Sequence, residues 1–188
     1  MWEKFYPDHF YDTIFEIPYK TLKEKNIQAL IFDVDNTLTA YRAKRPPEKT
    51  SSLLLRLKKM GFKIALLTNN NKQRLTVFNE NLKLPAYHQG LKPLAGKAKK
   101  AMKELGVSAG QTAIIGDQAL TDIWCGKRLK LTTILVKPIS QKDAFGVVLK
   151  RGLEKKIISS YLKNHDSNLK NHDSNLKNHD SNHQEPKK

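Results

Sequence analysis

Along residues 25–140, short apolar segments alternate with stretches of helical periodicity. Four apolar segments rich in strand-forming residues predict strands over 29–33, 63–67, 112–116 and 132–136. Apolar residues at helical spacing predict helices over 46–60, 72–82, 93–105 and 120–129. Strands joined by helices of this length form right-handed crossovers, so the pattern predicts an α/β fold with a doubly wound parallel sheet.

The chain changes character at residue 162. Residues 162–168, 169–175 and 176–182 each read LKNHDSN. One leucine per heptad is too few for a coiled coil, and Asn, Asp and Ser compete with the backbone for hydrogen bonds. We therefore expect a single domain over residues 1–161, followed by a disordered repeat tail over 162–188.

Two segments flank the predicted core of residues 25–140. Residues 1–24 form an N-terminal flap, in which the first nineteen positions hold seven of the fifteen aromatic residues of the chain. Residues 141–161 predict a basic amphipathic helix with apolar residues from Phe145 to Tyr161 near one face. Such aromatic rings and basic helices favour a membrane interface, although each segment could equally pack on the core. Both alternatives stay open at this point.

The net charge is +16, from 34 Lys and Arg against 18 Asp and Glu. Residues 1–161 hold 29 of these basic and 14 of these acidic residues, so +15 belongs to the predicted domain. A field of this sign favours polyanionic partners such as anionic lipid, nucleic acid or phosphorylated substrates. Since no apolar run is long enough to span a membrane and no secretory signal pattern is present, we expect a cytoplasmic protein, or one peripheral at the inner membrane surface. The single cysteine, Cys125, excludes an internal disulfide and a cysteine metal cluster.

Polar residues gather where the predicted strands end. In a parallel sheet the carboxyl ends of the strands lie at one edge, where α/β proteins bind their ligands. Two carboxylates two residues apart repel each other unless a divalent cation or a shared proton intervenes. A carboxylate cluster with a hydroxyl and a lysine suits phosphoryl transfer to an aspartate nucleophile. The candidates are Asp33 and Asp35 after the first strand, Thr68 and Asn69 after the second, Lys92 before a helix, and Asp117 and Asp122 after the third.

These four segments resemble motifs I to IV of the haloacid dehalogenase superfamily, in the family's order. They read DVDNT from residue 33, TNNN from residue 68, GLKP from residue 90 and GDQALTD from residue 116. The resemblance covers residues 25–140 and is closest to the YqeG-type, subclass IIIA phosphatases, which are similar to phosphatidylglycerophosphatases. It implies the family's Rossmann-like fold and a Mg²⁺-dependent phosphomonoester hydrolase that works through an aspartyl-phosphate intermediate.

The resemblance implies a role for each of these candidates. Asp33 would be the nucleophile and a metal ligand. Asp35 would be the general acid and base, and would also bind Mg²⁺ through its backbone carbonyl. Thr68 and Lys92 would be catalytic and, together with Asn69, would bind the phosphoryl group of the substrate.

The remaining motif residues would complete the metal site and hold its loops. The resemblance implies that Asp117 ligates Mg²⁺. It implies that Asp122 contacts the ion through a water molecule or contacts the residues that ligate it. Thr37 would fix the first loop. Asn36 stands where many relatives carry Gly, which is tolerable because Asn adopts left-handed backbone angles more readily than most residues.

The sequence leaves no room for a cap domain. The segment 37–46 is too short to hold one, and residues 71–92 accommodate only one helix and a short strand. Without a lid, the substrate itself must exclude water, which favours a large or membrane-borne phosphate such as phosphatidylglycerophosphate. Alternatives are a phosphatase for nucleic-acid ends or phosphoproteins, and a non-catalytic RNA- or ribosome-binding protein on the same scaffold, although no nucleic-acid-binding module is identifiable. A phospho-accepting receiver domain is disfavoured because Asp33 and Asp35 share the first strand and Asp117 follows Lys92.

Overall fold

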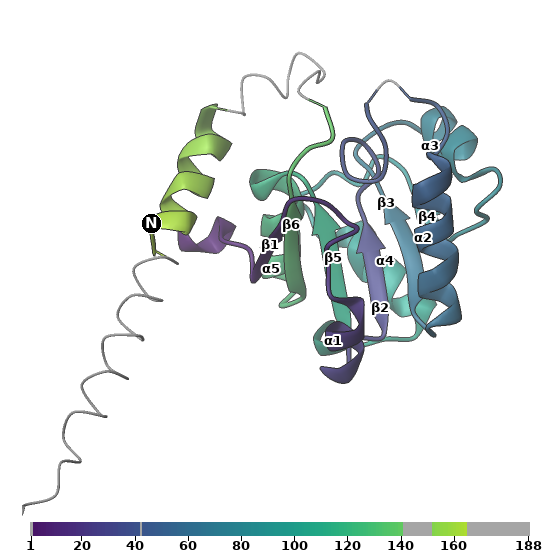
Figure 1. The fold of residues 1–188 in the computed structure, drawn as a ribbon, viewed down its shortest axis with the longest axis horizontal. Coiled ribbons are helices and arrows are strands. Elements are labelled where there is room, and N and C mark those ends of the chain that lie inside the picture. Colours follow the sequence, from purple (N-terminus) through teal and green to yellow (C-terminus); the bar gives the residue numbers. More distant parts are fainter. Residues whose placement is uncertain (1, 42, 141–151, 165–188) are drawn as a thin grey trace, which may run out of the picture.

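The computed structural model describes residues 2–41, 43–140 and 152–164 (Figure 1). Its centre is one six-stranded sheet in the order β1-β6-β5-β2-β3-β4, in which every neighbouring pair is parallel. The strands are β1 (His9–Tyr11), β2 (Ala29–Phe32), β3 (Lys63–Leu67), β4 (Ala86–Tyr87), β5 (Thr112–Gly116) and β6 (Thr132–Val136). The predicted α/β fold with a parallel sheet is confirmed, and β1 is an edge strand that the sequence did not predict.

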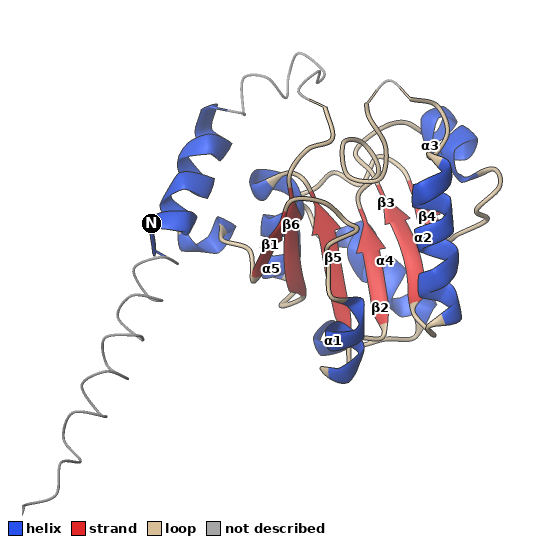
Figure 2. Ribbon diagram, in the orientation of Figure 1, coloured by secondary structure: helices blue, strands red, loops and turns tan. Residues whose placement is uncertain are grey.

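Helices cover both faces of the sheet (Figure 2). They are α1 (Tyr19–Glu24), α2 (Glu48–Lys59), α3 (Lys72–Asn79), α4 (Gly96–Leu105) and α5 (Trp124–Arg128), with short 3₁₀ turns at Glu3–Phe5 (η1) and Ala109–Gln111 (η2) and a π-helical turn at Ala119–Ile123 (η3). Successive residues of a strand point to opposite faces. Accordingly, Leu30 and Phe32 join the core under α1, α2 and α3, while Ile31 joins the core under α4 and α5. Strand β2 is therefore buried on both sides, which fixes the position of the residues that follow it.

All four predicted helices differ from their predicted bounds, and α3 ends at Asn79 rather than at residue 82. Helix α2 begins at Glu48 because Pro47 has extended backbone angles and serves as its N-cap. Helix α4 begins at Gly96, since the Leu94 amide donates to the Leu91 carbonyl and closes a separate turn before it. The helix predicted over 120–129 is divided into η3 and α5.

The flanking segments pack on the domain and on each other. Strand β1 extends the sheet beside β6, and the Phe5 ring meets the Trp124 ring edge to face at 5.2 Å. A final helix over residues 152–164 buries Ile157 completely, and the Tyr6 hydroxyl lies 2.7 Å from the Ser160 hydroxyl. For the described residues, this arrangement favours packing on the core over a free membrane-binding flap.

Part of the predicted C-terminal organisation lies outside the described residues. This applies to residues 141–151 of the predicted amphipathic helix and to residues 165–188 of the predicted repeat tail, whereas residues 162–164 complete the final helix. Within the described ranges, the connection from β2 to α2 contains no further folded unit, and that from β3 to α4 contains only α3 and β4. None of the helices in these ranges is long and apolar enough to cross a membrane.

Candidate active site

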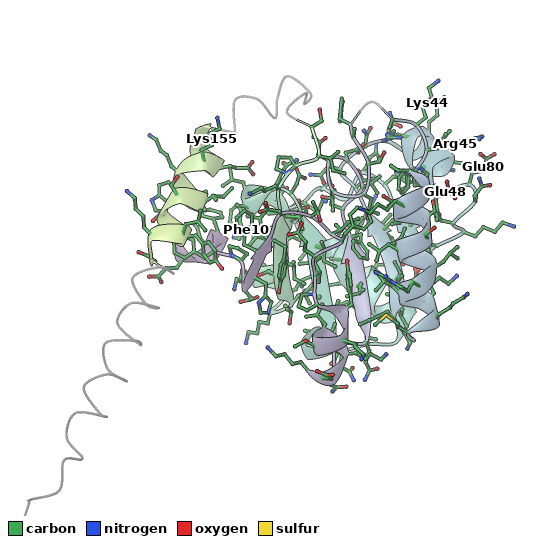
Figure 3. All side chains as sticks on the ribbon, viewed as in Figure 1. Phe10, Lys44, Arg45, Glu48, Glu80 and Lys155 are labelled. Carbon is green, nitrogen blue, oxygen red and sulfur yellow. The ribbon has the colours of Figure 1, made fainter. Side chains whose placement is uncertain are left out.

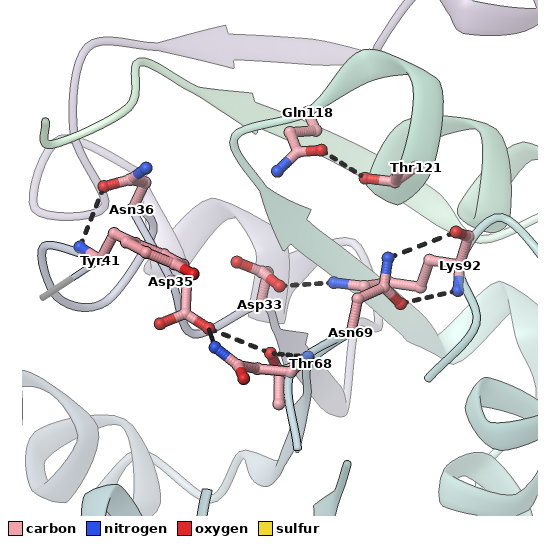
Figure 4. A pocket seen from close by; sticks show the side chains of 10 residues that line it. Asp33, Asp35, Asn36, Tyr41, Thr68, Asn69, Lys92, Gln118 and Thr121 are labelled. Carbon is pink, nitrogen blue, oxygen red and sulfur yellow. Dashed lines mark hydrogen bonds and ion pairs between the residues drawn. The ribbon is translucent and has the colours of Figure 1, made fainter. Parts of the chain in front are cut away.

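A pocket of about 260 Å³ opens at the carboxyl edge of the sheet (Figure 4). It is lined by Asp33, Asp35, Asn36, Tyr41, Thr68, Asn69, Asn70, Lys92, Gln118 and Thr121. The carboxylate oxygens of Asp117 and Asp122 lie within 4.8 Å of one another and of Asp33. The structure thus brings together all seven site residues that the sequence predicted, because each follows or closely neighbours a strand end of one parallel sheet.

Lys92 connects the acidic residues of two different motifs. Its Nζ donates hydrogen bonds to Asp33 Oδ1 at 2.5 Å, to Asp122 Oδ1 at 2.6 Å and to the Leu67 carbonyl at 2.9 Å. The side chain of Lys92 is only 2% exposed. An ammonium group has three hydrogens, so these three acceptors satisfy it fully. Lys92 is therefore held as a buried cation at the floor of the pocket.

One ammonium does not neutralise the three carboxylates around it. Burial raises the pKa of Asp33 to about 7; the Lys92 ammonium opposes this rise, and the Asp122 carboxylate adds to it. Burial alone would lower the pKa of Lys92, but the carboxylates of Asp122 and Asp33 outweigh it and raise that pKa. Like charges buried together favour either a retained proton or an additional cation.

The donor set fits a divalent metal ion. Asp33, Asp117 and Asp122 are buried and offer carboxylate oxygens close enough to converge on one ion. Hard cations such as Mg²⁺ prefer carboxylate and carbonyl oxygens. These three residues could hold such an ion, and its charge would offset the burial and the carboxylate repulsion that together raise the pKa of Asp33.

Asp35 points toward a different set of partners. Its Oδ2 accepts hydrogen bonds from the Thr68 hydroxyl at 3.2 Å and the Asn70 side-chain amide at 3.3 Å. Figure 4 shows Asp35 beside Thr68. Its Oδ1 accepts from Nε and an Nη of Arg74 at 3.2 and 3.1 Å. The Arg74 guanidinium also donates to the Lys44 carbonyl at 2.9 Å. Asp35 thus lies at the pocket wall, held by these donors apart from the three clustered acids.

Asn69 joins the second motif to the third. The Lys92 amide donates to Asn69 Oδ1 at 2.8 Å, and Asn69 Nδ2 donates to the Lys92 carbonyl at 3.3 Å. The Gly90 amide donates to the Thr68 carbonyl at 2.8 Å in the same place. The side chain amide of Asn69 therefore fixes the loop that carries Lys92, in addition to lining the pocket.

The first motif turns sharply after Asp35. Asn36 adopts a left-handed φ of 65°, an angle that Asn tolerates better than most residues, so its presence in place of Gly is compatible with the fold. The Asn36 Oδ1 accepts from the Tyr41 amide at 3.2 Å, which closes the loop. Thr37 is buried, and its hydroxyl donates to Asp117 Oδ1 at 3.5 Å. The loop is thus anchored to the fourth motif, as its predicted fixing role requires.

The fourth motif depends on a glycine at the end of β5. A Cβ atom added to Gly116 would lie 2.3 Å from the Asp122 carboxyl group, so only glycine leaves room for that side chain. Asp122 Oδ2 also accepts from the Gln118 amide at 3.1 Å. From the final helix, the buried Glu154 accepts from the Leu120 amide at 3.4 Å. Backbone and distant side chain together fix the turn that carries Asp122.

Sequence reasoning missed Arg74 and Glu154. Arg74 lies in the first turn of α3, where an arginine two positions after a lysine resembles any solvated basic residue. Its pairing with Asp35 depends on a fold contact between residues 39 positions apart. Glu154 belongs to a helix whose docking position no local pattern specifies. Arg74 could have been found by listing the charged residues in the first turn of each helix that follows a predicted strand. Glu154 could not have been found in this way.

Solved structures confirm the fold. A cobalt-bound deoxy-D-mannose-octulosonate 8-phosphate phosphatase from Haemophilus influenzae superposes with a TM-score of 0.50 at 21% identity, covering 74% of this chain and 91% of its own. At this identity the likeness shows the fold alone.

Sequence relatives are more specific. A probable phosphatase, YqeG of Bacillus subtilis, is 33% identical over 161 residues, which span 85% of this chain and 94% of the relative. Phosphatidylglycerophosphate phosphatase 1 of Arabidopsis thaliana is 28% identical over 159 residues, spanning 78% of this chain and 45% of that longer protein.

The family model of haloacid dehalogenase-like hydrolases matches residues 4–136, which include all four motifs and every strand of the sheet. The carboxylates, lysine and hydroxyl of those motifs meet in one site at the carboxyl edge of the sheet. The chain therefore belongs to the haloacid dehalogenase-like hydrolase family, among its phosphatases.

Proposed function

We propose that this protein is a Mg²⁺-dependent phosphomonoester hydrolase that forms an aspartyl-phosphate on Asp33 and acts on a membrane-borne lipid phosphate resembling phosphatidylglycerophosphate. The observation that carries the proposal is the buried cluster in which Lys92 bonds both Asp33 and Asp122 beside Asp117. It combines a nucleophile, a fixed positive charge and a set of metal ligands in one pocket.

The residues divide the work of phosphoryl transfer between them. The Asp33 carboxylate attacks the phosphorus atom, and the bond from phosphorus to the alcohol oxygen breaks as the new bond forms. Asp35 then gives its proton to the departing alkoxide. In the second half, Asp35 takes a proton from water, which attacks the phosphorus of the aspartyl-phosphate and releases inorganic phosphate and the Asp33 carboxylate.

The remaining groups hold charge and position. Lys92 and Thr68 line the pocket, where a preorganised ammonium and hydroxyl would stabilise the negative charge that develops on the phosphoryl oxygens. Asp33, Asp117 and Asp122, with the backbone carbonyl of Asp35, would hold Mg²⁺. When bound, the ion supplies positive charge to the phosphoryl oxygens and lowers the repulsion between nucleophile and substrate.

A lipid phosphate is favoured by three features together. The described part of the chain has no cap domain over the pocket, so a bulky substrate can reach it. The positive charge of residues 1–161 suits an anionic surface. The Arabidopsis relative is named for hydrolysis of phosphatidylglycerophosphate. We also propose that the enzyme is cytoplasmic and acts peripherally at the inner membrane surface, where its positive charge would favour contact with anionic lipid.

The test is phosphate release from a panel of three substrates. Phosphatidylglycerophosphate in mixed micelles, an oligonucleotide with a terminal phosphate and a soluble small phosphate ester are each incubated with Mg²⁺ or with EDTA. We expect the highest kcat/KM for the lipid, loss of activity in EDTA and no activity in Asp33→Asn. Preference for the oligonucleotide would favour the nucleic-acid alternative. Release that survives Asp33→Asn would reject the mechanism.

A further inference from the structure

Three exposed apolar side chains lie in the loops around the pocket. Leu91, Leu94 and Ile139 are 65%, 54% and 55% exposed. Leu91 and Leu94 follow β4, and Ile139 follows β6, so the parallel sheet places all three at its carboxyl edge with the catalytic residues. Single exposed apolar residues are ordinary, but a group around one site indicates an interaction surface.

Hydrogen bonds tie these residues to opposite sides of the pocket. The Leu94 amide donates to the Leu91 carbonyl at 2.7 Å, which forms a turn around the backbone of Lys92. On the other side, the Ile139 amide donates to the Asn36 carbonyl at 2.9 Å, and Asn36 lines the pocket. Leu91 and Leu94 on one side and Ile139 on the other therefore lie in loops that adjoin residues lining the pocket.

The loops that carry them are basic. We call residues 43–47, 88–97 and 137–140 the rim loops. They contain no Asp or Glu, and their basic residues besides the buried Lys92 are Lys44, Arg45, Lys97 and Lys137. Lys137 also pairs with Asp12 at 2.6 Å. Lys44 and Arg45 point outward beyond the strand ends (Figure 3), although Arg45 also pairs with Glu80 of the neighbouring connection at 2.9 Å. Apolar side chains among cations suit the interface of an anionic bilayer, where the former enter the headgroup region and the latter contact lipid phosphates.

The segments that the sequence nominated for membrane contact are less suited to it. Phe5 is buried against Trp124, and the final helix packs its buried side, with Ile157, on the rest of the domain. The exposed leucines of that helix, Leu153 and Leu162, are nine positions apart, which at 3.6 residues per turn places them on opposite sides of its axis. They cannot enter one bilayer surface together.

We infer that the rim loops are the surface by which this protein docks on an anionic bilayer, with Leu91, Leu94 and Ile139 entering the interface around the pocket. This inference rests on the proposed lipid substrate and extends it by naming the docking face. It directs the pocket toward the membrane, so that a lipid headgroup phosphate can reach Asp33 while its chains stay in the bilayer.

The test is flotation of the full-length protein with vesicles of phosphatidylcholine containing about 30 mol% phosphatidylglycerol. The variant Leu94→Gln/Ile139→Gln should partition roughly tenfold more weakly. The wild type gains free energy when these two half-exposed apolar side chains move from water into the bilayer interface, and glutamine does not provide this gain. Leu55→Gln/Val77→Gln is the matched control, since Leu55 on α2 and Val77 on α3 are 55% and 36% exposed and lie outside the rim loops. It should partition like the wild type. Leu91 is left in place because its φ is 49° and it adjoins Lys92.

A substitution in the opposite direction guards against a folding defect. Leu94→Trp should bind these vesicles more tightly than the wild type, because tryptophan prefers the interface. All proteins should bind vesicles of phosphatidylcholine alone more weakly. The inference is wrong if the rim variant Leu94→Gln/Ile139→Gln binds as tightly as the wild type. It is also wrong if the control variant loses as much binding as the rim variant, or if the wild type does not bind at all.

The assay separates this inference from the proposed function because it contains no phosphomonoester and needs no turnover. If the rim variant binds normally while the wild type hydrolyses the lipid, the docking face is wrong and the function stands. If the wild type docks through the rim loops but releases no phosphate from the lipid, the function is wrong and the docking face stands.

Discussion

Replacing Lys92 by methionine keeps most of the length of the side chain and removes its charge. In the protein, the Lys92 ammonium bonds Asp33 at 2.5 Å and Asp122 at 2.6 Å, and all three side chains are at most 9% exposed. Without it, two buried carboxylates and the Leu67 carbonyl lose their common donor. The site would then hold three clustered carboxylates without the ammonium that bonds two of them.

The expected cost follows from the burial of these groups. Removing one partner of a buried ion pair lowers the free energy of unfolding by about 3–5 kcal/mol. The cost should be full near pH 8, where Asp33 is ionised, and smaller near pH 5, because the pKa of Asp33 lies at about 7 even with Lys92 present and protonation relieves the repulsion. Mg²⁺ should also relieve it, and at about 100 times its Kd a bound ion contributes about 2.7 kcal/mol.

Urea unfolding followed by tryptophan fluorescence measures these changes in EDTA and in Mg²⁺. Lys63→Met is the control, because Lys63 is exposed and its Nζ bonds the Leu105 carbonyl at 2.6 Å without contacting the site. It should lower the free energy of unfolding by no more than about 1 kcal/mol, the net contribution of one exposed hydrogen bond, and equally at both pH values and with or without Mg²⁺. If Lys92→Met lost the same stability at both pH values and regained none of it with Mg²⁺, the carboxylate cluster would not be the source of the effect.

Three further predictions follow from the same geometry. In EDTA the free energy of unfolding of the wild type should fall by about 2–3 kcal/mol between about pH 5 and pH 8.5. The pKa of Asp33 is raised from 3.8 to about 7, so the stability that its protonated form contributes is lost as pH rises through the higher value. Urea midpoints that stay constant would contradict this. Gly116→Ala should weaken Mg²⁺ binding, measured by calorimetry, at least tenfold, because the new Cβ would displace the Asp122 carboxyl group; unchanged affinity would show that the turn yields freely. Arg74→Ala should lower kcat about tenfold or more with a small change in KM for a soluble ester, because Asp35 loses its guanidinium partner, and Arg74→Lys should restore part of kcat; a change in KM alone would assign Arg74 to substrate binding instead.

The sheet and most of the site could be predicted from the sequence because both depend on local patterns. Four strands read directly as apolar segments, and the parallel order brings Asp33, Thr68 and Lys92 together without any knowledge of contacts. Strand β1 was missed because three half-buried residues leave no alternation to detect. The pairing of Arg74 with Asp35 was missed because it is set by the tertiary position of α3 rather than by spacing.

The aromatic N-terminal segment shows why burial is harder to predict than periodicity. Composition could not distinguish a membrane-facing ring from a packed one, and the structure places Phe5 against Trp124. Conversely, Leu91 and Leu94 attracted no notice in the sequence, because two leucines in a short turn form no periodic face. Their exposure is decided by the turn that positions Lys92 between them.

The central claim is that Asp33 takes the phosphoryl group from a lipid phosphate. The most direct measurement is a rapid-quench experiment with phosphatidylglycerophosphate labelled at its terminal phosphate, followed by mapping of the labelled peptide. We predict transient label on the peptide that contains Asp33 in the wild type and none in Asp33→Asn. Release of labelled phosphate with no label on that peptide, or unchanged release by Asp33→Asn, would contradict the account.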